Sequence, residues 1–538
     1  MPFIWKRNWG TAWLLPLIVA FGAWTRWSGF TRHELWFDDA WVAVPTRVGL
    51  GEAIHMVNTT PLFSLFMRQW ILWGPDATWW SQIPAFFTGL IAIVAVYRLI
   101  KFFTFGETMA LLGALVIAAS PIVIDYSTHL KQYNLDIIFT SLVLWLAERW
   151  RRNYSLRGAW QLALASSIAL LTSASTVVVV APVLAIAAVS AWRDRARRRD
   201  VLVLGGLVGT TFVVEWMVWL SHLSHGLYVG WRHRGYLLDT SNLHRFVFSL
   251  QTMGSQFFHW MLAVPTGHKP DPDHHITVLG LMISATVAIV LVALVAPTLW
   301  HFLRRPFAAQ SPLLGSALAL SLSALLALVR RSPFGGGRTD EVIYPALLLL
   351  VASLLSRWAP RVRQRFALAP RVLVVASVIA LSFVGLTNRS HYPTIDLKGP
   401  VAGMEAARLP SDGVVIDPWL GFTWAAADLP HFTVSREKSF FDWSQGFHIN
   451  GDATYVFSEN YFFPSWTYKY LDQHFSRLWY VAETGSPAWP ATSPNDRIYV
   501  TRNLADLLSR GWVMTSTKFV GSHVEVVLLQ YSPEAVAN

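Results

Sequence analysis

The strongest pattern in the chain is a series of long apolar runs separated by polar connections. A transmembrane helix needs about 20 mostly apolar residues, and nine runs approach or reach this length. They lie near residues 11–28, 82–100, 107–124, 134–148, 201–221, 276–299, 312–329, 341–356 and 370–387. A further stretch, 160–192, is too long for one helix and is interrupted at 172–176, so it predicts two helices joined by a tight turn. The pattern therefore predicts about eleven transmembrane helices.

The pattern changes near residue 390, where charged and polar residues return to the density of a soluble protein. Short runs rich in β-branched and aromatic residues predict strands, with two predicted helices between them. The strands are expected at 413–417, 478–482, 497–500 and 524–531, and the helices at 419–428 and 503–510. The predicted fold class is mainly α: a polytopic membrane helix bundle over residues 1–389, followed by a small C-terminal α/β domain over residues 390–538.

The basic residues predict how this bundle is oriented. Lys and Arg gather in every second connection and near the N-terminus, at Lys6 and Arg7, 98–101, 149–152, 193–199, 304–305 and 357–365. Connections rich in Lys and Arg stay in the cytoplasm, so the N-terminus is predicted to be cytoplasmic. With an odd number of spans, the C-terminal domain is predicted to be extracytoplasmic.

Composition agrees with a membrane protein, because 54% of the residues are hydrophobic and only 14% are charged. The 28 Trp residues suit the membrane interface. The basic connections account for the net charge of +11, so we expect no nucleic-acid partner. The absence of Cys excludes disulfides and thiolate metal sites. We interpret the first run as a retained helix and not a signal peptide, because no small-residue cleavage site follows it.

An acidic pair follows the first predicted span, in the stretch His33-Glu34-Leu35-Trp36-Phe37-Asp38-Asp39-Ala40-Trp41. A carboxylate among large apolar side chains at the interface costs free energy unless it has a partner or a purpose. Partial burial also makes a carboxylate a better base. One interpretation is a catalytic carboxylate that faces a membrane-bound substrate. The other is an acidic helix start, which the helix dipole favours.

Three further segments of the predicted outer face carry candidate chemistry. Residues 58–70 combine apolar and aromatic side chains and predict a helix that lies in the interface. Lys131, in a short connection, could pair with a lipid phosphate or extend to water. In Arg331-Ser-Pro-Phe-Gly-Gly-Gly-Arg338 the glycines would let the backbone approach a ligand. Arg338 would contact a phosphate there, with Arg331 as a weaker candidate; the alternative is a flexible hairpin.

Two groups of histidines are weak candidates for a metal site. His268, His274 and His275 lie in a proline-containing loop, and His222 and His225 are three residues apart near the end of a predicted helix. Both groups are better interpreted as polar residues of the interface.

Taken together, these segments resemble the polytopic GT-C glycosyltransferases. The similarity is to the bacterial branch that is itself similar to glycosyltransferase family 39 and the dolichyl-phosphate-mannose protein mannosyltransferases. Four motifs carry it in order: the acidic motif Glu34–Ala40, Thr60-Pro61-Leu62-Phe63 where the branch has Pro-Pro-Leu-Tyr, Ser120-Pro121 through Tyr126-Ser127 to Lys131 and Tyr133, and Pro333–Arg338. The resemblance covers about residues 30–360, and residues 390–538 resemble only the variable α/β domains of some members.

The resemblance implies a transferase of the bacterial plasma membrane. A hexose or pentose would pass from a polyprenyl-phosphate donor to a hydroxyl of a glycan, lipid or protein acceptor, on the extracytoplasmic face and with inversion. Asp38 and Asp39 are the expected catalytic residues, Asp38 as general base and Asp39 orienting the acceptor or holding a divalent cation such as Mg or Mn. The expected substrate-binding residues are Lys131, Tyr133, Arg338, Trp36, Trp41 and Arg331. Membrane lipids are the remaining expected partners.

Two positions depart from the family pattern, and two other functions remain open. Asp39 stands where Glu is commoner, and Lys131 stands where Arg is usual, which changes geometry but not charge. The first alternative is a lipid or glycan transporter or flippase, which would need charged residues within the spans; Glu215 is the main candidate. The second is an assembly protein without catalysis, which would bind through its outer domain.

Overall fold

The structure is a computed structural model of the whole chain. It describes residues 13–29, 35, 37–43, 60–75, 77–103, 105–193, 197–218, 231–232, 234–263, 276–304, 312–365, 369–388, 397–416, 434–436, 446–449, 452–458, 465–483, 503–521 and 524–532. The chain divides into two compact units, and each is described by itself. The first unit comprises Met1–Gly29 and Ile83–His391, and the second comprises Phe30–Gln82 and Tyr392–Asn538.

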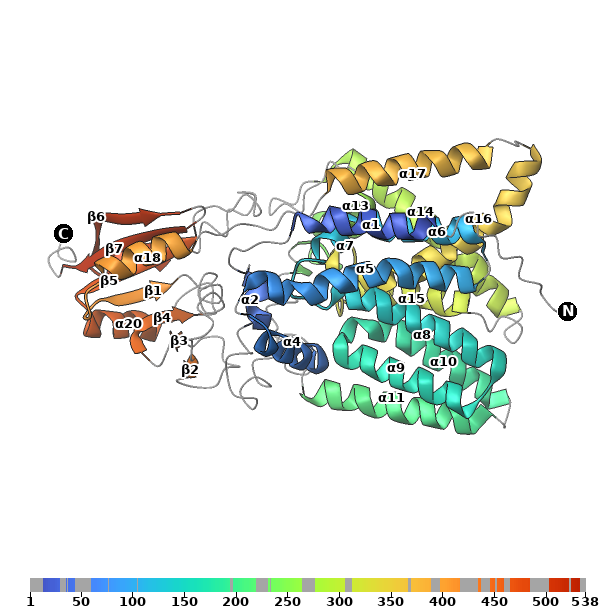
Figure 1. Ribbon diagram of the computed structural model, residues 1–538, viewed down its shortest axis with the longest axis horizontal. Coiled ribbons are helices and arrows are strands. Elements are labelled where there is room, and N and C mark those ends of the chain that lie inside the picture. Colours follow the sequence, from blue (N-terminus) through green and yellow to red (C-terminus); the bar gives the residue numbers. More distant parts are fainter. Residues whose placement is uncertain are drawn as a thin grey trace. The chain divides into compact units, whose positions relative to one another are not determined.

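The first unit is a helix bundle in which every predicted span has a helix. The eleven corresponding helices are α1 (Leu14–Trp27), α5 (Thr78–Phe102), α6 (Glu107–Ala119), α8 (Tyr133–Asn153), α9 (Leu156–Thr172), α10 (Val177–Arg193), α11 (Arg198–Val218), α14 (Val278–Arg304), α15 (Pro312–Leu328), α16 (Tyr344–Arg365) and α17 (Ala369–Thr387). Most of them run side by side in Figure 1. The prediction of a polytopic membrane bundle of about eleven spans is confirmed.

Length and apolar composition support the membrane assignment. Among the described residues, four helices are long and apolar enough to cross a membrane: Thr78–Phe102, Arg198–Met217, Val278–Trp300 and Arg338–Ser356. Five shorter apolar helices accompany them. Large apolar side chains are exposed on the outside of the bundle, among them Leu202, Ile289 and Phe383. Such surfaces are costly in water and suit contact with lipid tails.

Three short elements join the long helices at one end of the bundle. They are α7 (Pro121–Asp125), between α6 and α8, the 3₁₀ turn η2 (Ala174–Thr176), between α9 and α10, and the 3₁₀ helix η5 (Arg338–Ile343), directly before α16. Both α7 and η2 contact η5. The tight turn predicted at 172–176 is confirmed as η2.

An additional helix lies where the sequence predicts only a long connection. Within residues 222–275 the chain forms α13 (Leu243–Leu262). Its buried residues include Met253, Phe257 and Met261, whose spacing of four residues places them on one face of a helix. The interspersed His, Arg and Gln residues conceal this face in a simple hydropathy pattern, which is why the helix was missed.

The second unit contains a mixed sheet and several helices. Its helices are α2 (Phe37–Ala43), α4 (Pro61–Trp73), α18 (Lys398–Ala407) and α20 (Ser465–His474), and residues 503–509 are also helical. The strands are β1 (Gly413–Ile416), β2 (Val434–Arg436), β3 (Gly446–Ile449), β4 (Asp452–Ser458), β5 (Arg477–Glu483), β6 (Trp512–Val520) and β7 (Val524–Tyr531). Their order is β2-β3-β4-β1-β5-β7-β6, with β1 parallel to β4 and β5.

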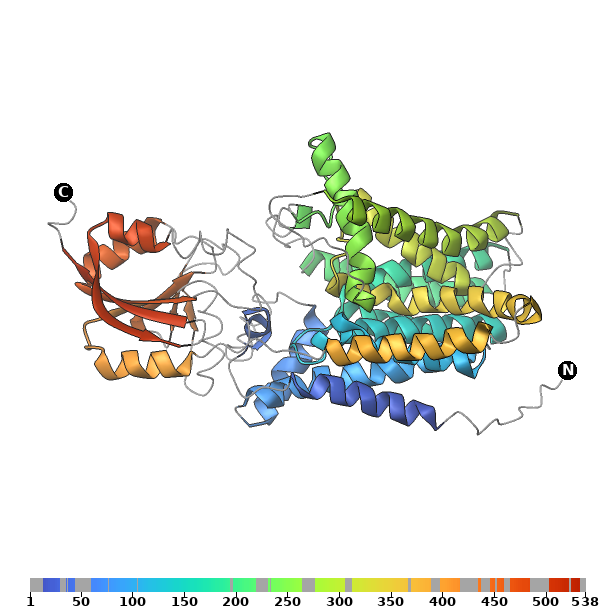
Figure 2. The ribbon, with the colours of Figure 1, turned by 90° about the horizontal axis from the view of Figure 1, so that it is seen from above.

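The sheet is covered on both faces. Successive side chains of β5 point to opposite faces of the sheet, and those on each face are buried. Leu478 and Tyr480 pack in a core with Tyr468 of α20. Trp479, between them, points to the other face, where its ring lies 5.9 Å from that of Phe519. In Figure 2 helix α18, in orange, and the redder helices lie on opposite sides of the sheet.

The predicted C-terminal α/β fold is therefore confirmed in its main elements. The strands predicted at 413–417, 478–482 and 524–531 correspond to β1, β5 and β7, and the helix predicted at 503–510 is present. The predicted helix at 419–428 and strand at 497–500 lie outside the described residues. The helix predicted over residues 58–70 is observed as α4, which has Phe63 and Met67 buried and Phe66 and Trp73 exposed. Its position in the membrane interface stays a prediction.

Candidate active site

The predicted catalytic pair lies in the first turn of α2. Asp39 is completely buried, while the side chain of Asp38 lies outside the described residues. Residues 33 and 34 and the side chains of Trp36 and Trp41 also fall outside them. Acidic residues in a first helical turn are favourable in any case, so the position agrees with both interpretations of this pair. Their catalytic roles stay predictions.

Lys131 lies in the short connection between α7 and α8, and it is buried. The residue is only 8% exposed, so its side chain does not extend to water as one interpretation proposed. Its backbone N–H donates to the carbonyl oxygen of His129 at 2.8 Å, which fixes a tight turn. Next to it the rings of Tyr126 and Tyr133 meet edge to face, with centroids 4.9 Å apart. The connection is thus a packed segment that holds its lysine inside the bundle.

Two of the predicted substrate-binding residues meet directly. The guanidinium of Arg338, at the start of η5, lies 5.9 Å from the ring centroid of Tyr133, at the start of α8. This is a cation–π distance. The motif around Ser120–Tyr133 and the motif around Pro333–Arg338 are therefore neighbours in space. Arg331 differs from Arg338, because its side chain is exposed.

The glycine turn before η5 packs against protein. Gly335 and Gly337 have φ values of +77° and +73°, which L side chains rarely adopt. A Cβ on Gly335 would lie 2.6 Å from the carbonyl oxygen of Met253, and one on Gly337 would lie 2.9 Å from the ring of Trp260. Both neighbours belong to α13. The close approach that Gly335 and Gly337 permit is therefore to a helix, and their approach to a ligand stays a prediction.

Gly335→Ala is expected to cost about 2–3 kcal/mol of stability, from the strained φ and the clash with a carbonyl oxygen. Gly336→Ala is the matched control, because Gly336 has an ordinary φ and its nearest neighbour is the side-chain oxygen of Thr339 at 2.9 Å. Thermal unfolding in detergent, followed by Trp fluorescence, compares the two variants. Equal losses in both would show that the turn is not held by α13.

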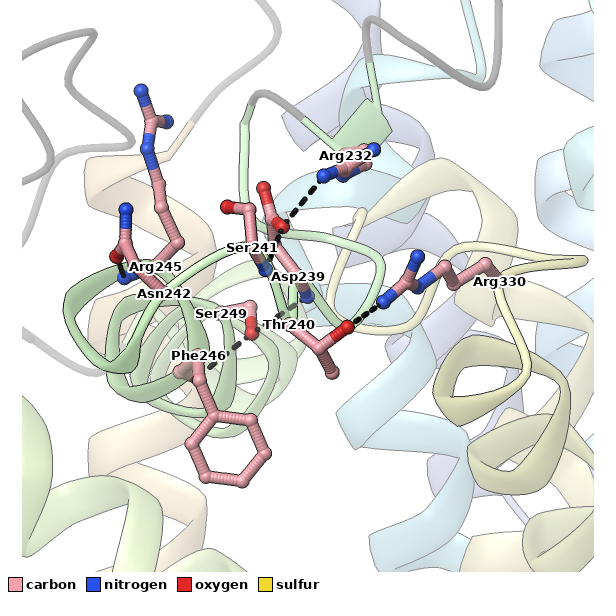
Figure 3. Close-up of polar contacts among 9 residues, drawn as sticks. All are labelled: Arg232, Asp239, Thr240, Ser241, Asn242, Arg245, Phe246, Ser249 and Arg330. Carbon is pink, nitrogen blue, oxygen red and sulfur yellow. Dashed lines mark hydrogen bonds and ion pairs between the residues drawn. The ribbon is translucent and has the colours of Figure 1, made fainter.

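A polar network fixes the entry to α13 and is drawn in Figure 3. Arg232 pairs with Asp239 at 2.8 Å, and the backbone N–H of Ser241 donates to the same carboxylate at 3.0 Å. Asn242 caps α13 by accepting from the N–H of Arg245 at 2.8 Å. The side chain of Arg330 donates to Thr240, which ties this entry to the end of α15.

Backbone contacts extend this tie to the glycine turn. The N–H of Leu238 donates to the carbonyl of Ala327 at 3.2 Å, and the N–H of Phe334 donates to the carbonyl of Tyr236 at 3.0 Å. The rings of Phe257 and Phe334 then stack with centroids 5.0 Å apart. The loop before α13 and the loop before η5 are therefore one packed structure, and it sets where Arg338 begins η5.

The Arg232–Asp239 pair predicts acid sensitivity of this loop. Burial alone would raise the pKa of Asp239, but hydrogen bonds from Arg232 and Ser241 outweigh it and hold the pKa at about 2. Because the pKa of Asp239 is lower in the folded than in the unfolded chain, its charge stabilises the fold at any pH above the ordinary pKa of 3.8. This stabilisation is lost as the pH falls from 3.8 through about 2. Arg232 is 42% exposed, so solvent screening limits the contribution to about 1 kcal/mol.

Asp239→Asn should therefore melt below the wild type at neutral pH, and this difference should vanish as the pH falls toward 2. Glu405→Gln, in an exposed ion pair with Arg408 at 3.3 Å, is the control and should differ little from the wild type at any pH. A difference that persists unchanged at low pH would contradict the assignment of the charge to Asp239.

Arg26 is the residue of this region that sequence reasoning missed. It is completely buried in α1, where Nε donates to Oγ of Ser127 at 2.8 Å. Its other nitrogens donate to the carbonyl oxygens of Ala118 at 3.0 Å and Ile117 at 3.1 Å, at the end of α6. Ser127 also accepts from Asn134 at 3.0 Å. Arg26 thus fastens the connection that carries Lys131, and a lone arginine inside an apolar run was the available signal.

No described residues form a ready-made metal centre. Within the described ranges, no three or more His, Asp or Glu side chains are grouped so that they could hold a metal ion. His222, His225 and His268–His275 lie outside those ranges. The cation that Asp39 could hold stays a prediction.

Comparison with known proteins identifies the type of fold. The family described as dolichyl-phosphate-mannose-protein mannosyltransferase matches residues 58–219 of the chain. No curated protein matches the chain in sequence. This family match covers the segment from α4 to α11, which includes Lys131 and Tyr133 but neither Asp38 nor Arg338.

Solved structures match over nearly the whole chain. ArnT from Cupriavidus metallidurans in the apo state is 13% identical, with a TM-score of 0.52 over 98% of this chain and 99% of that one. The same protein bound to undecaprenyl phosphate is 14% identical, with a TM-score of 0.50 and the same coverage. The archaeal oligosaccharyltransferase AglB from Archaeoglobus fulgidus, in complex with an inhibitory peptide and a dolichol-phosphate, is 12% identical, with a TM-score of 0.50 over 97% of this chain and 74% of that one. The chain thus has the GT-C fold, and its resemblance to the GT-C glycosyltransferases of the protein mannosyltransferase type is confirmed.

Proposed function

We propose that the protein is a membrane glycosyltransferase that moves a hexose or pentose from a polyprenyl-phosphate donor to an acceptor hydroxyl. The observation that carries the proposal is the contact of Arg338 with Tyr133, two residues after the buried Lys131, at one end of a GT-C bundle. Two basic groups in a largely desolvated place suit a phosphate. Similar folds were solved with undecaprenyl phosphate and with a dolichol-phosphate, which supports a lipid carrier of this class.

The proposed reaction is one displacement at the anomeric carbon. Asp38 takes the proton of the acceptor hydroxyl as its oxygen attacks that carbon. The bond from the anomeric carbon to the phosphate oxygen breaks with its electron pair moving to the phosphate, so the configuration inverts. The leaving polyprenyl phosphate gains one negative charge, and Arg338 and Lys131 stabilise it. We propose that the reaction takes place on the extracytoplasmic face, because the Lys- and Arg-rich connections lie at the opposite end of the bundle and predict that end to be cytoplasmic.

The departures from the family pattern affect geometry within this proposal. Lys131 provides a point charge where a guanidinium would form a bidentate pair with the phosphate. Asp39 has a shorter side chain than the commoner Glu, and it is buried. We expect it to orient the acceptor or to help hold a divalent cation. Trp36 and Trp41 would stack on sugar or lipid.

A transporter or flippase is the second candidate, and Glu215 is the observation that favours it. Glu215 is completely buried, and neither carboxylate oxygen has a hydrogen-bond partner among the described residues. It lies three residues before the end of α11, at Val218, so it is near a helix end and not in the middle of the span. Transport would require carboxylates nearer the midplane, and we therefore favour the transferase.

The test separates bond cleavage from movement of intact lipid. Purified protein in liposomes is given undecaprenyl-phosphate-linked hexoses and pentoses with radiolabelled sugars, together with membrane extract as acceptor. A transferase moves the label into an acid-stable product and releases unlabelled carrier. A flippase relocates the intact donor without release. Relocation of donor with no transfer from any of these sugars would overturn the proposed function.

A further inference from the structure

Buried polar atoms without partners gather around η5. Glu341 is completely buried, and neither of its carboxylate oxygens has a hydrogen-bond partner among the described residues. The same holds for the hydroxyl of Tyr344 and for one carboxylate oxygen each of Asp136 and Asp340. Buried polar groups in native proteins are nearly always paired with protein, water or ligand. These atoms therefore mark a place that water or a ligand can fill.

The atoms belong to one group. Glu341 interacts electrostatically with Asp136, Asp340 and Arg26, and Tyr344 interacts with Asp340 and Glu341. The hydroxyl of Thr140 donates to the carbonyl of Val342 at 2.8 Å, so η5 is fixed on α8. The group thus lies at the junction of α8, η5 and α16, all within the first unit.

The remaining oxygens of Asp136 and Asp340 are held by the protein. One oxygen of Asp136 accepts from Oγ of Ser175 in η2 at 2.7 Å. One oxygen of Asp340 accepts from the backbone N–H of Gly337 at 3.2 Å. Each carboxylate is therefore anchored on one side and carries an unused acceptor on the other. Glu341 carries two unused acceptors.

The group lies beside the proposed phosphate site. Arg338 and Glu341 are three residues apart in a 3₁₀ helix, in which residues i and i+3 lie on the same face. The rise of that helix separates them by about 6 Å along its axis. A sugar linked to a phosphate at Arg338 would extend over a distance of this size. Glu341 is thus placed to reach the ring when Arg338 holds the phosphate.

We propose that Glu341, Tyr344 and Asp136 bind hydroxyl groups of the sugar that the donor carries. The inference rests on the proposed function and adds the sugar site to it. Carboxyl oxygens accept hydrogen bonds from hydroxyl groups, so they suit a ligand rich in hydroxyl groups. A metal ion is the other ligand of such groups, but no three acidic or His side chains among the described residues are close enough to hold one.

The test compares binding of two lipids that differ only in the sugar. Undecaprenyl phosphate is the probe without sugar, and undecaprenyl-phosphate-linked hexoses and pentoses are the probes with it. The wild type should bind one of the sugar-bearing lipids more tightly than the plain phosphate. Glu341→Gln should reduce this preference about tenfold, because the amide replaces one oxygen that can accept a hydrogen bond from the sugar by an NH₂ group that cannot. Arg338→Gln should weaken both lipids equally and leave the preference intact.

Tyr344→Phe is the second variant and separates ligand contact from folding. It removes a hydroxyl that has no partner among the described residues, so thermal stability without lipid should not fall. A reduced sugar preference in this stable variant would support the site. Unchanged preference in both Glu341→Gln and Tyr344→Phe would overturn it and leave water as the partner of these atoms, while the transferase proposal would stand. A wild type that binds no carrier lipid would overturn both proposals.

Discussion

Asp38→Asn should reduce the rate of sugar transfer by about 10²- to 10⁴-fold, the usual contribution of a general base. The amide keeps the size of the side chain but cannot take a proton from the acceptor hydroxyl. Binding of the donor should change little, because the proposed phosphate and sugar contacts come from other residues. Single-turnover transfer from the donor that the wild type uses, with donor binding measured in parallel, gives both quantities.

Glu405→Gln is the control for this variant. Glu405 is a carboxylate of the same unit as Asp38, and its side chain is 38% exposed in an ion pair with Arg408. It should transfer at the wild-type rate. If Asp38→Asn also transfers at that rate and remains folded, Asp38 is not the base, and the acidic pair is better interpreted as the start of α2.

Arg338→Gln should lower the rate of transfer by about 10²- to 10³-fold, a loss typical of removing one group that stabilises developing charge. Arg338→Lys should retain part of the rate, since the charge stays while the planar donor pair is lost. Arg331→Gln should have a much smaller effect, because that side chain is exposed while Arg338 lies against Tyr133.

Arg234→Gln is the matched control, as Arg234 is an exposed arginine in the loop before α13. Steady-state kinetics with varied donor measure each variant. A larger loss in Arg331→Gln than in Arg338→Gln would contradict the placement of the phosphate at η5. Comparable losses in Arg338→Gln, Arg331→Gln and Arg234→Gln would indicate a general effect of positive charge on the attraction of anionic lipid.

The helices of the bundle were predictable from the sequence because the membrane imposes a local rule. Each span must satisfy its own backbone hydrogen bonds and present apolar side chains over its whole length. That rule is visible in a window of about 20 residues, and α14 and α17 follow it without tertiary information. The strands β1, β5 and β7 were found for the same reason, since buried strands are short apolar runs.

Helix α13 shows where this local rule fails. Its apolar face is interrupted by polar residues that satisfy each other or the neighbouring helix, as Gln251 does by accepting from the N–H of Thr277 at 2.9 Å. A polar side chain whose hydrogen bonds are satisfied can be buried in the fold, although in the sequence it is typical of a loop. For Gln251 the hydrogen-bond partner that allows burial lies 26 positions away in the chain, so a local pattern does not reveal it.

The candidate site was predictable as a set of motifs but not as a geometry. Lys131, Tyr133 and Arg338 were identified from the sequence, and the structure places Arg338 on Tyr133. Whether Lys131 extends to water or into the bundle depended on the packing of its connection, which Arg26 fastens through Ser127 over 101 positions. No pattern in either segment contains that information.

The sequence by itself determined the class of this protein: a polytopic bundle with a C-terminal α/β fold and the ordered motifs of a GT-C glycosyltransferase. These properties depend on the composition and order of short segments. The tertiary structure alone decided that Gly335 and Gly337 pack on α13, and that Glu341 and Tyr344 are buried with unused polar atoms. Close approach and hydrogen-bond pairing depend on which distant segments meet, and local patterns of apolar and polar residues do not encode those meetings.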